Sequence, residues 1–105
     1  MAIYVGVLEM HAGEDKTIQS SPPDDVTDPP DISDWTLEAR CTWTDGSAGF
    51  TKDENSFAIA TPDWTLTLDS DDTDGMIGRR LEFHVWRIDA GFETELDWGF
   101  INVLR

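Results

Sequence analysis

The chain has 105 residues, which suits one domain with a single core and leaves little room for a large active site beside it. Its 22 acidic and seven basic residues give a formal net charge of −15, which repels nucleic-acid phosphates and anionic lipid. We therefore expect neither nucleic acid nor a membrane as a partner. The charge favours solubility, and it also fits a salty environment or a basic docking partner.

A single cysteine, Cys41, cannot form an internal disulfide. Its place in an alternating apolar strand predicts a small buried thiol rather than a nucleophile. The N-terminal stretch MAIYVGVLEM has no basic region and no apolar run long enough for a signal or a membrane span. Synthesis and residence, or assembly, in a cytoplasm is the resulting expectation.

The N-terminal third holds two predicted strands and a loop. Residues 2–10 predict a first strand with Ile3, Val5 and Val7 on one face, and residues 15–20 predict a short second one. The loop, SPPDDVTDPPDISD at 21–34, holds four of the five prolines and five aspartates, which block strand pairing. It is either an extended connection between sheets, the favoured interpretation, or a partner-binding segment. Its interface candidates are Pro22, Pro23, Val26, Pro29 and Pro30.

Strong alternation marks the rest of the chain. Residues 35–44 predict a half-buried central strand, and a polar turn region runs from there to residue 55. Further strands are predicted at 56–60, 64–69, 80–88 and 93–104, the last two joined by a tight turn at 89–91.

Seven strands with at most one short helical turn, in DSDDTDGMI, predict an all-β fold. We expect a single immunoglobulin-like β-sandwich spanning residues 1–105. Its predicted core consists of Trp35, Leu37, Ala39, Cys41, Trp43, Phe57, Ile59, Trp64, Leu66, Leu68, Leu81, Phe83 and Val85.

The acidic run at 69–75 is the strongest candidate for a metal site. An EF-hand frame starting at Ser70 supplies Asp72, Asp74 and Gly75, but Leu81 stands where the bidentate glutamate is needed. An Asx-rich turn accounts for these residues without a metal, although a looser cation site stays open. The prediction is no metal and no cofactor.

Catalytic signals are also lacking. His11 and His84 have no companion ligands at metal-binding spacing, and His84 is expected to be a partly exposed strand residue. No nucleophile-elbow pattern occurs. We therefore predict no catalytic residues and a protein that is not an enzyme.

The five tryptophans are the main alternative to a purely structural reading, because exposed rings can stack on sugars. Trp35, Trp43 and Trp64 fall in register with the core. Trp86 and Trp98 are left as candidates for a partner interface or for carbohydrate binding.

The stretches GEDKTI, DISDWTLEARCTW, WTLTLDSDDTDGM and LEFHVWRIDAGFETELDWGFINV together look like the small immunoglobulin-like domains of tailed-phage virion proteins. The chain resembles the N-terminal domain of phage baseplate upper proteins over nearly its whole length. The resemblance implies a non-enzymatic module of the tail, baseplate or head, located in the virion and assembled in the host cytoplasm. It would dock to other virion proteins, often within a ring or another homo-oligomer. Because no fibre follows Arg105, we expect a bridging or capping role.

Overall fold

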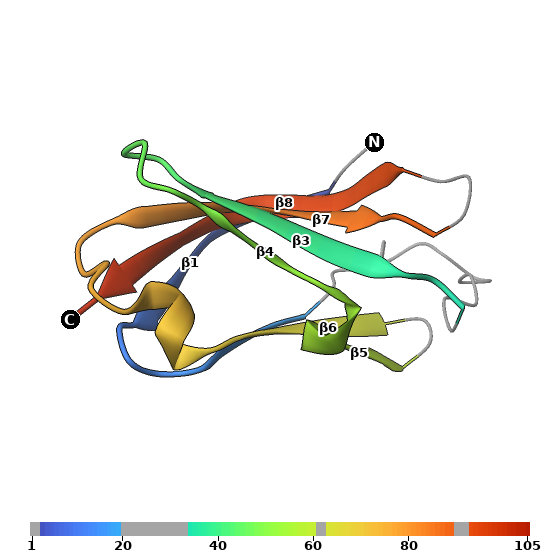
Figure 1. The fold of residues 1–105 in the computed structure, drawn as a ribbon, viewed down its shortest axis with the longest axis horizontal. Helices are drawn as coiled ribbons and strands as arrows, with labels where there is room; N and C mark the ends of the chain where they lie inside the picture. Colours follow the sequence, from blue (N-terminus) through green and yellow to red (C-terminus); the bar gives the residue numbers. More distant parts are fainter. Residues whose placement is uncertain (1–2, 20–33, 61–62, 90–92) are drawn as a thin grey trace.

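The computed structural model describes residues 3–19, 34–60, 63–89 and 93–105 (Figure 1). These ranges contain eight strands and two short 3-10 turns. The strands are β1 (Ile3–His11), β2 (Lys16–Gln19), β3 (Leu37–Trp43), β4 (Phe50–Lys52), β5 (Phe57–Ala60), β6 (Asp63–Leu68), β7 (Arg80–Arg87) and β8 (Thr94–Leu104), and the turns are η1 (Glu54–Ser56) and η2 (Ser70–Thr73). The predicted single helical turn after β6 is confirmed as η2. Among the described residues, no helix is long and apolar enough to cross a membrane.

The strands form two sheets that lie in separate layers (Figure 1). The larger sheet has the order β1-β8-β7-β3-β4, and the smaller one has the order β2-β6-β5. β1 runs parallel to β8, whereas the other described strand pairs are antiparallel. Two sheets packed face to face are typical of immunoglobulin-like sandwiches. The predicted fold class is therefore confirmed.

The core lies between the sheets, where alternate side chains of β3, β6, β7 and β8 meet. The buried apolar residues are Met10, Ile18, Leu37, Ala39, Cys41, Trp43, Trp64, Leu66, Leu68, Leu81, Phe83, Val85, Ile101 and Val103. Most of the predicted core is confirmed, with Trp35, Phe57 and Ile59 only partly buried against it. The predicted core lacks Met10 of β1, Ile18 of β2, and Ile101 and Val103 of β8. For β8 no inward face is predicted from the sequence.

A bulge in β1 overturns one predicted face. The pairing with β8 shifts register between Tyr4 and Val7, so Val7 points outward and is 46% exposed. Gly6 accommodates the bulge with a φ of +95°. Gly99 lies directly beneath it: a Cβ there would come within 2.7 Å of Val5 Cγ2 and 2.8 Å of the Gly6 carbonyl oxygen.

The stretch after β3 also differs from its prediction as a polar turn region. Phe50–Lys52 forms β4 and pairs antiparallel with β3. A three-residue strand is too short to show an alternation that sequence patterns detect. η1 follows, capped by the Asp53 carboxylate, which accepts a hydrogen bond from the Asn55 backbone N–H at 3.0 Å. In Figure 1 this segment carries the chain from the larger sheet down to the smaller one.

Candidate functional site on the outer face of the larger sheet

The outer face of the larger sheet carries the side chains that point away from the core on β1, β8, β7 and β3. Cross-strand pairing brings Tyr4, Trp98, His84 and Arg40 into one row across these strands. The next row contains Val7, Phe100, Glu82 and Thr42. Side chains in such rows contact one another directly, so the pairing defines a continuous surface.

Aromatic rings cluster around Trp98. Its ring centroid lies 4.6 Å from that of Tyr4 and 5.7 Å from that of Phe100, the latter edge to face. On the β7 side the imidazole of His84 is nearly parallel to it, at 5.8 Å and 7°. Trp98 is thus flanked by rings from both neighbouring strands, within the range of favourable aromatic pairs.

Trp86 lies beside this cluster under an arginine. The guanidinium carbon of Arg40 is 4.6 Å from the Trp86 ring centroid, which is a cation–π distance. Glu38 and Glu93 hold Arg40 there through contacts of 2.7 Å and 3.1 Å. One face of the Trp86 ring is therefore already covered by the protein itself.

His84 is partly exposed, as predicted, and contacts two carboxylates. Its Nδ1 lies 2.5 Å from Glu95 Oε1, and its Nε2 lies 3.2 Å from Glu82 Oε2. Burial alone would lower the pKa of His84, but the hydrogen bonds and charges of Glu95 and Glu82 outweigh it and raise the pKa above its ordinary value. The imidazole therefore adds positive charge to this face at mildly acidic pH.

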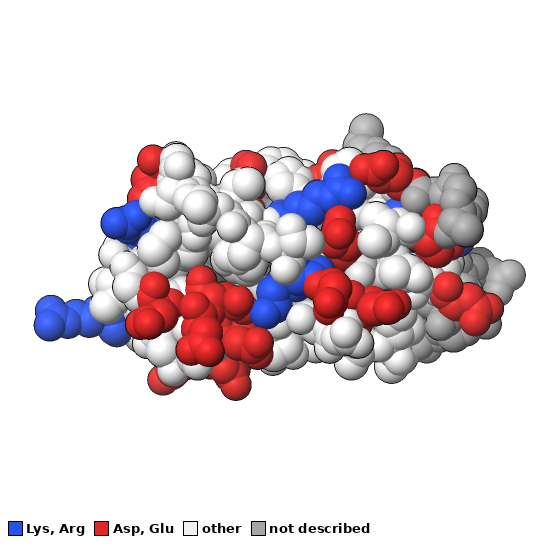
Figure 2. Space-filling view, viewed as in Figure 1, with Lys and Arg blue, Asp and Glu red and all other residues white. Residues whose placement is uncertain are grey.

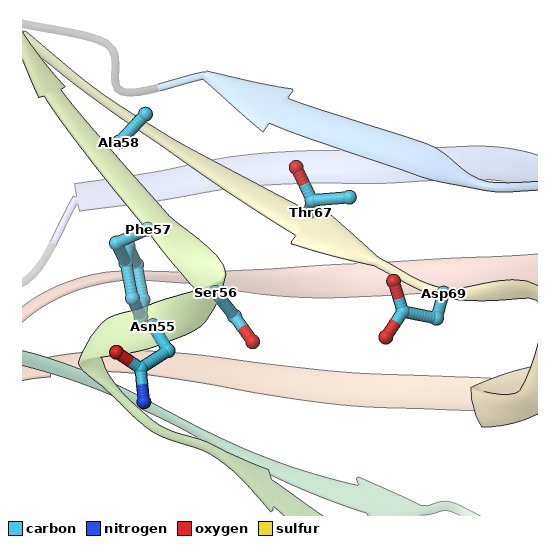
Figure 3. Close-up of a pocket in the computed structure, with 6 residues that line it drawn as sticks. All are labelled: Asn55, Ser56, Phe57, Ala58, Thr67 and Asp69. Carbon is cyan, nitrogen blue, oxygen red and sulfur yellow. The ribbon is translucent and has the colours of Figure 1, made fainter.

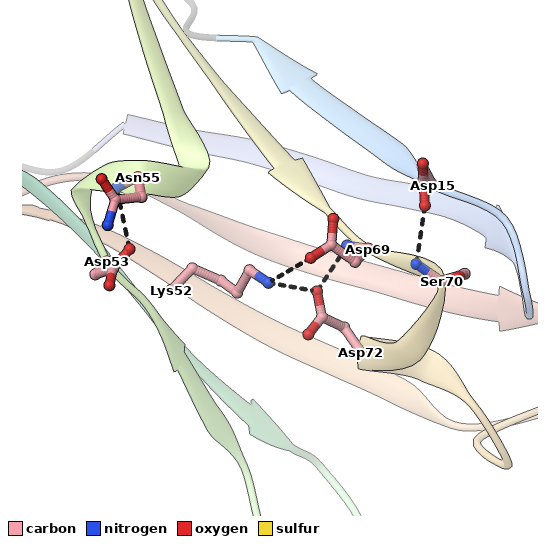
Figure 4. Close-up of polar contacts among 7 residues, drawn as sticks. All are labelled: Asp15, Lys52, Asp53, Asn55, Asp69, Ser70 and Asp72. Atoms are coloured by element: carbon pink, nitrogen blue, oxygen red, sulfur yellow. Dashed lines mark hydrogen bonds and ion pairs between the residues drawn. The ribbon is translucent and has the colours of Figure 1, made fainter.

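The ammonium group of Lys52 lies among the carboxylates of the acidic run after β6. Figure 2 shows carboxylates gathered over the region where Figure 1 draws η2. Lys52 Nζ lies 2.9 Å from Asp72 Oδ2 and 3.3 Å from Asp69 Oδ2 (Figure 4). Asp72 also accepts a hydrogen bond from the Asp69 backbone N–H at 2.7 Å, and Asp15 accepts one from Ser70 N at 2.9 Å. These carboxylates thus already accept hydrogen bonds from the backbone of the turn or form ion pairs with Lys52.

The structure brings no metal-binding set together in the described part of the chain. Within it, no group of three or more His, Cys, Asp and Glu side chains is placed to hold an ion. Lys52 contacts Asp72 of the EF-hand frame and Asp69 just before it, and its ammonium offsets one of these two carboxylate charges.

A shallow, open hollow lies beside η1 (Figure 3). Its lining residues are Asn55, Ser56, Phe57, Ala58, Thr67 and Asp69. Ser56 and Asp69 bring a hydroxyl and a carboxylate to it, but the lining includes no histidine to activate the serine. Cys41 lies in the core, and burial raises the pKa of its thiol to about 12, as fits the predicted unreactive cysteine.

The predicted interface residues fall into two groups. Trp86 and Trp98 both lie on the outer face, away from the core. Pro22, Pro23, Val26, Pro29 and Pro30 lie outside the described residues, as does most of the 89–91 turn. Sequence reasoning missed Tyr4, Arg40 and Phe100, whose link to the two tryptophans depends on strand pairing.

Comparison with known proteins adds no family assignment. The chain matches no family model, and no curated protein matches it.

Proposed function

We propose that this chain is a structural docking module of a tailed-phage virion, belonging to the tail, baseplate or head. It acts through assembly with other virion proteins rather than through catalysis, and several copies form a ring or another homo-oligomer in the particle. The resemblance of its strand motifs to phage immunoglobulin-like domains supports this role, as does the sandwich fold.

The outer aromatic face is the observation that carries the proposal. A sandwich needs one face of each sheet for its core, and the other face is normally polar. Here that second face holds Tyr4, Val7, Trp98 and Phe100 together, with Tyr4 50% and Val7 46% exposed. Aromatic residues concentrated on a surface are typical of protein interfaces.

Quantitative mass spectrometry of purified virions tests the role. The chain should be present in a fixed ratio to the major capsid protein, and the ratio should survive further purification. Its absence from particles, with abundance only in infected cells, would contradict the proposal.

Carbohydrate binding is the alternative function. The packing around the two tryptophan rings disfavours it. A sugar stacks on an open aromatic face, but Tyr4 and His84 flank Trp98 and Arg40 covers one face of Trp86. Glycan arrays probed with the wild type and Trp86→Ala separate the two functions. Specific binding that the substitution abolishes would support the alternative.

A further inference from the structure

Two adjoining regions divide the outer face of the larger sheet. The first is an apolar strip on β1 and β8, in which Tyr4 pairs with Trp98 and Val7 pairs with Phe100. Among the described strands β1 is an edge strand, so the strip reaches the border of the sheet.

The second region is a charged border on β7, β3 and the start of β8. It holds four carboxylates, those of Glu38, Glu82, Glu93 and Glu95, against two guanidinium groups, those of Arg40 and of Arg80, which lies 5.5 Å from the Phe100 ring centroid. The local charge is −2 with His84 neutral, from four negative groups and two positive groups. Each of the four carboxylates contacts Arg40 or His84, and the negative charges still outnumber the positive ones.

This combination is complementary to one kind of surface. We propose that the outer face docks a protein surface whose apolar side chains are flanked by lysine or arginine. This inference rests on the proposed docking function and names the partner's chemistry. The apolar strip would supply the buried centre of the contact and the carboxylates its polar rim.

A second copy of the chain is a poor occupant of the same face. Each copy carries a net charge of −15, and a symmetric contact would bring the same carboxylates toward one another. Copies within a ring would therefore contact one another through other surfaces.

The test uses the full chain, labelled with ¹⁵N, and a short peptide of central leucines flanked by lysines. Peptide binding should shift the amide resonances around Tyr4, Trp98 and His84, and the affinity should fall as salt is added. A control peptide with glutamates in place of the lysines, and another with serines in place of the leucines, should bind about tenfold more weakly or not at all.

Matched variants distinguish specific docking from nonspecific hydrophobic binding. Tyr4→Ser together with Val7→Ser should weaken peptide binding about tenfold, since both side chains are exposed and their loss leaves the core intact. Ile77→Ser removes another exposed apolar side chain, 54% accessible and in the turn between η2 and β7, and should leave binding unchanged. The variants' spectra report whether each one folds.

Several results would overturn the inference. They are shifts confined to the η2 turn, equal binding of the glutamate peptide, absence of binding, or concentration-dependent shifts at this face without peptide, which would assign it to a second copy. The virion role is judged separately, because peptide binding at this face by a chain absent from particles would refute only that role.

Discussion

Replacing Lys52 with methionine tests how much the lysine contacts in the acidic turn at η2 stabilise the fold. The Lys52 side chain is only 12% exposed, and it contacts Asp72, which is 16% exposed, and Asp69, which is 64% exposed. Methionine keeps an unbranched chain in the space but removes the ammonium. The substitution leaves Asp72 mostly buried with a hydrogen bond from the Asp69 backbone N–H and no neutralising charge.

The expected cost lies between those of exposed and buried ion pairs. The solvent-exposed contact with Asp69 contributes at most about 0.5 kcal/mol. The shielded contact with Asp72 resembles a hydrogen bond to a charged group, which contributes about 1.5–3 kcal/mol. Desolvation of the lysine offsets part of this gain. We therefore expect Lys52→Met to lower the free energy of unfolding by about 2 kcal/mol.

Urea denaturation at neutral pH and low salt measures this change, with the slope of the transition checked for constancy. Arg79→Met is the matched control, because the Arg79–Asp45 pair is 42% exposed on both sides at 2.8 Å. It should cost less than about 1 kcal/mol. Equal losses for the two variants would refute the reasoning that shielding makes the Lys52 contacts stabilising.

Three further predictions concern the core, the bulge and the outer face. Phe83→Ala should lower the free energy of unfolding by about 3–5 kcal/mol in chemical denaturation, because the ring is fully buried; a loss below about 1 kcal/mol would contradict its core position. Gly99→Ala should lower the free energy of unfolding by about 1–3 kcal/mol in the same assay, since the added Cβ meets the Gly6 carbonyl oxygen at 2.8 Å. An unchanged free energy of unfolding would show that β1 shifts to accommodate the Cβ without cost. His84 has a raised pKa in the folded state, so its stabilising effect is present below the ordinary histidine pKa and is lost as pH rises through the raised value. The stability difference between the wild type and His84→Gln should therefore be larger at about pH 5.5 than at about pH 8.5, and a difference independent of pH would count against the pairing with Glu82 and Glu95.

The sandwich could be predicted because most of its strands alternate cleanly. In β3, for example, Leu37, Ala39, Cys41 and Trp43 are all buried, as their period of two indicates. Prediction failed in β1, where the bulge at Gly6 reverses the alternation, since a single extra residue leaves no pattern of its own.

The candidate site could be predicted only in part. Trp86 and Trp98 were identified because they fall outside the core register, but their neighbours come from other strands. Tyr4 lies 94 positions before Trp98 in the sequence, and only the parallel pairing of β1 with β8 places the two rings 4.6 Å apart. Sequence alternation assigns a face to each residue but not its neighbour on the next strand.

Hydroxyl-radical footprinting of intact virions is the most direct test of a docking role through the outer face. It compares the oxidation of Tyr4 and Trp98 in the particle with that in the free chain, and exposed Ile77 serves as the internal reference. We predict strong protection of Tyr4 and Trp98 in the particle, with Ile77 less affected. A chain present in virions whose Tyr4 and Trp98 are oxidised as fast as in the free protein would contradict this prediction.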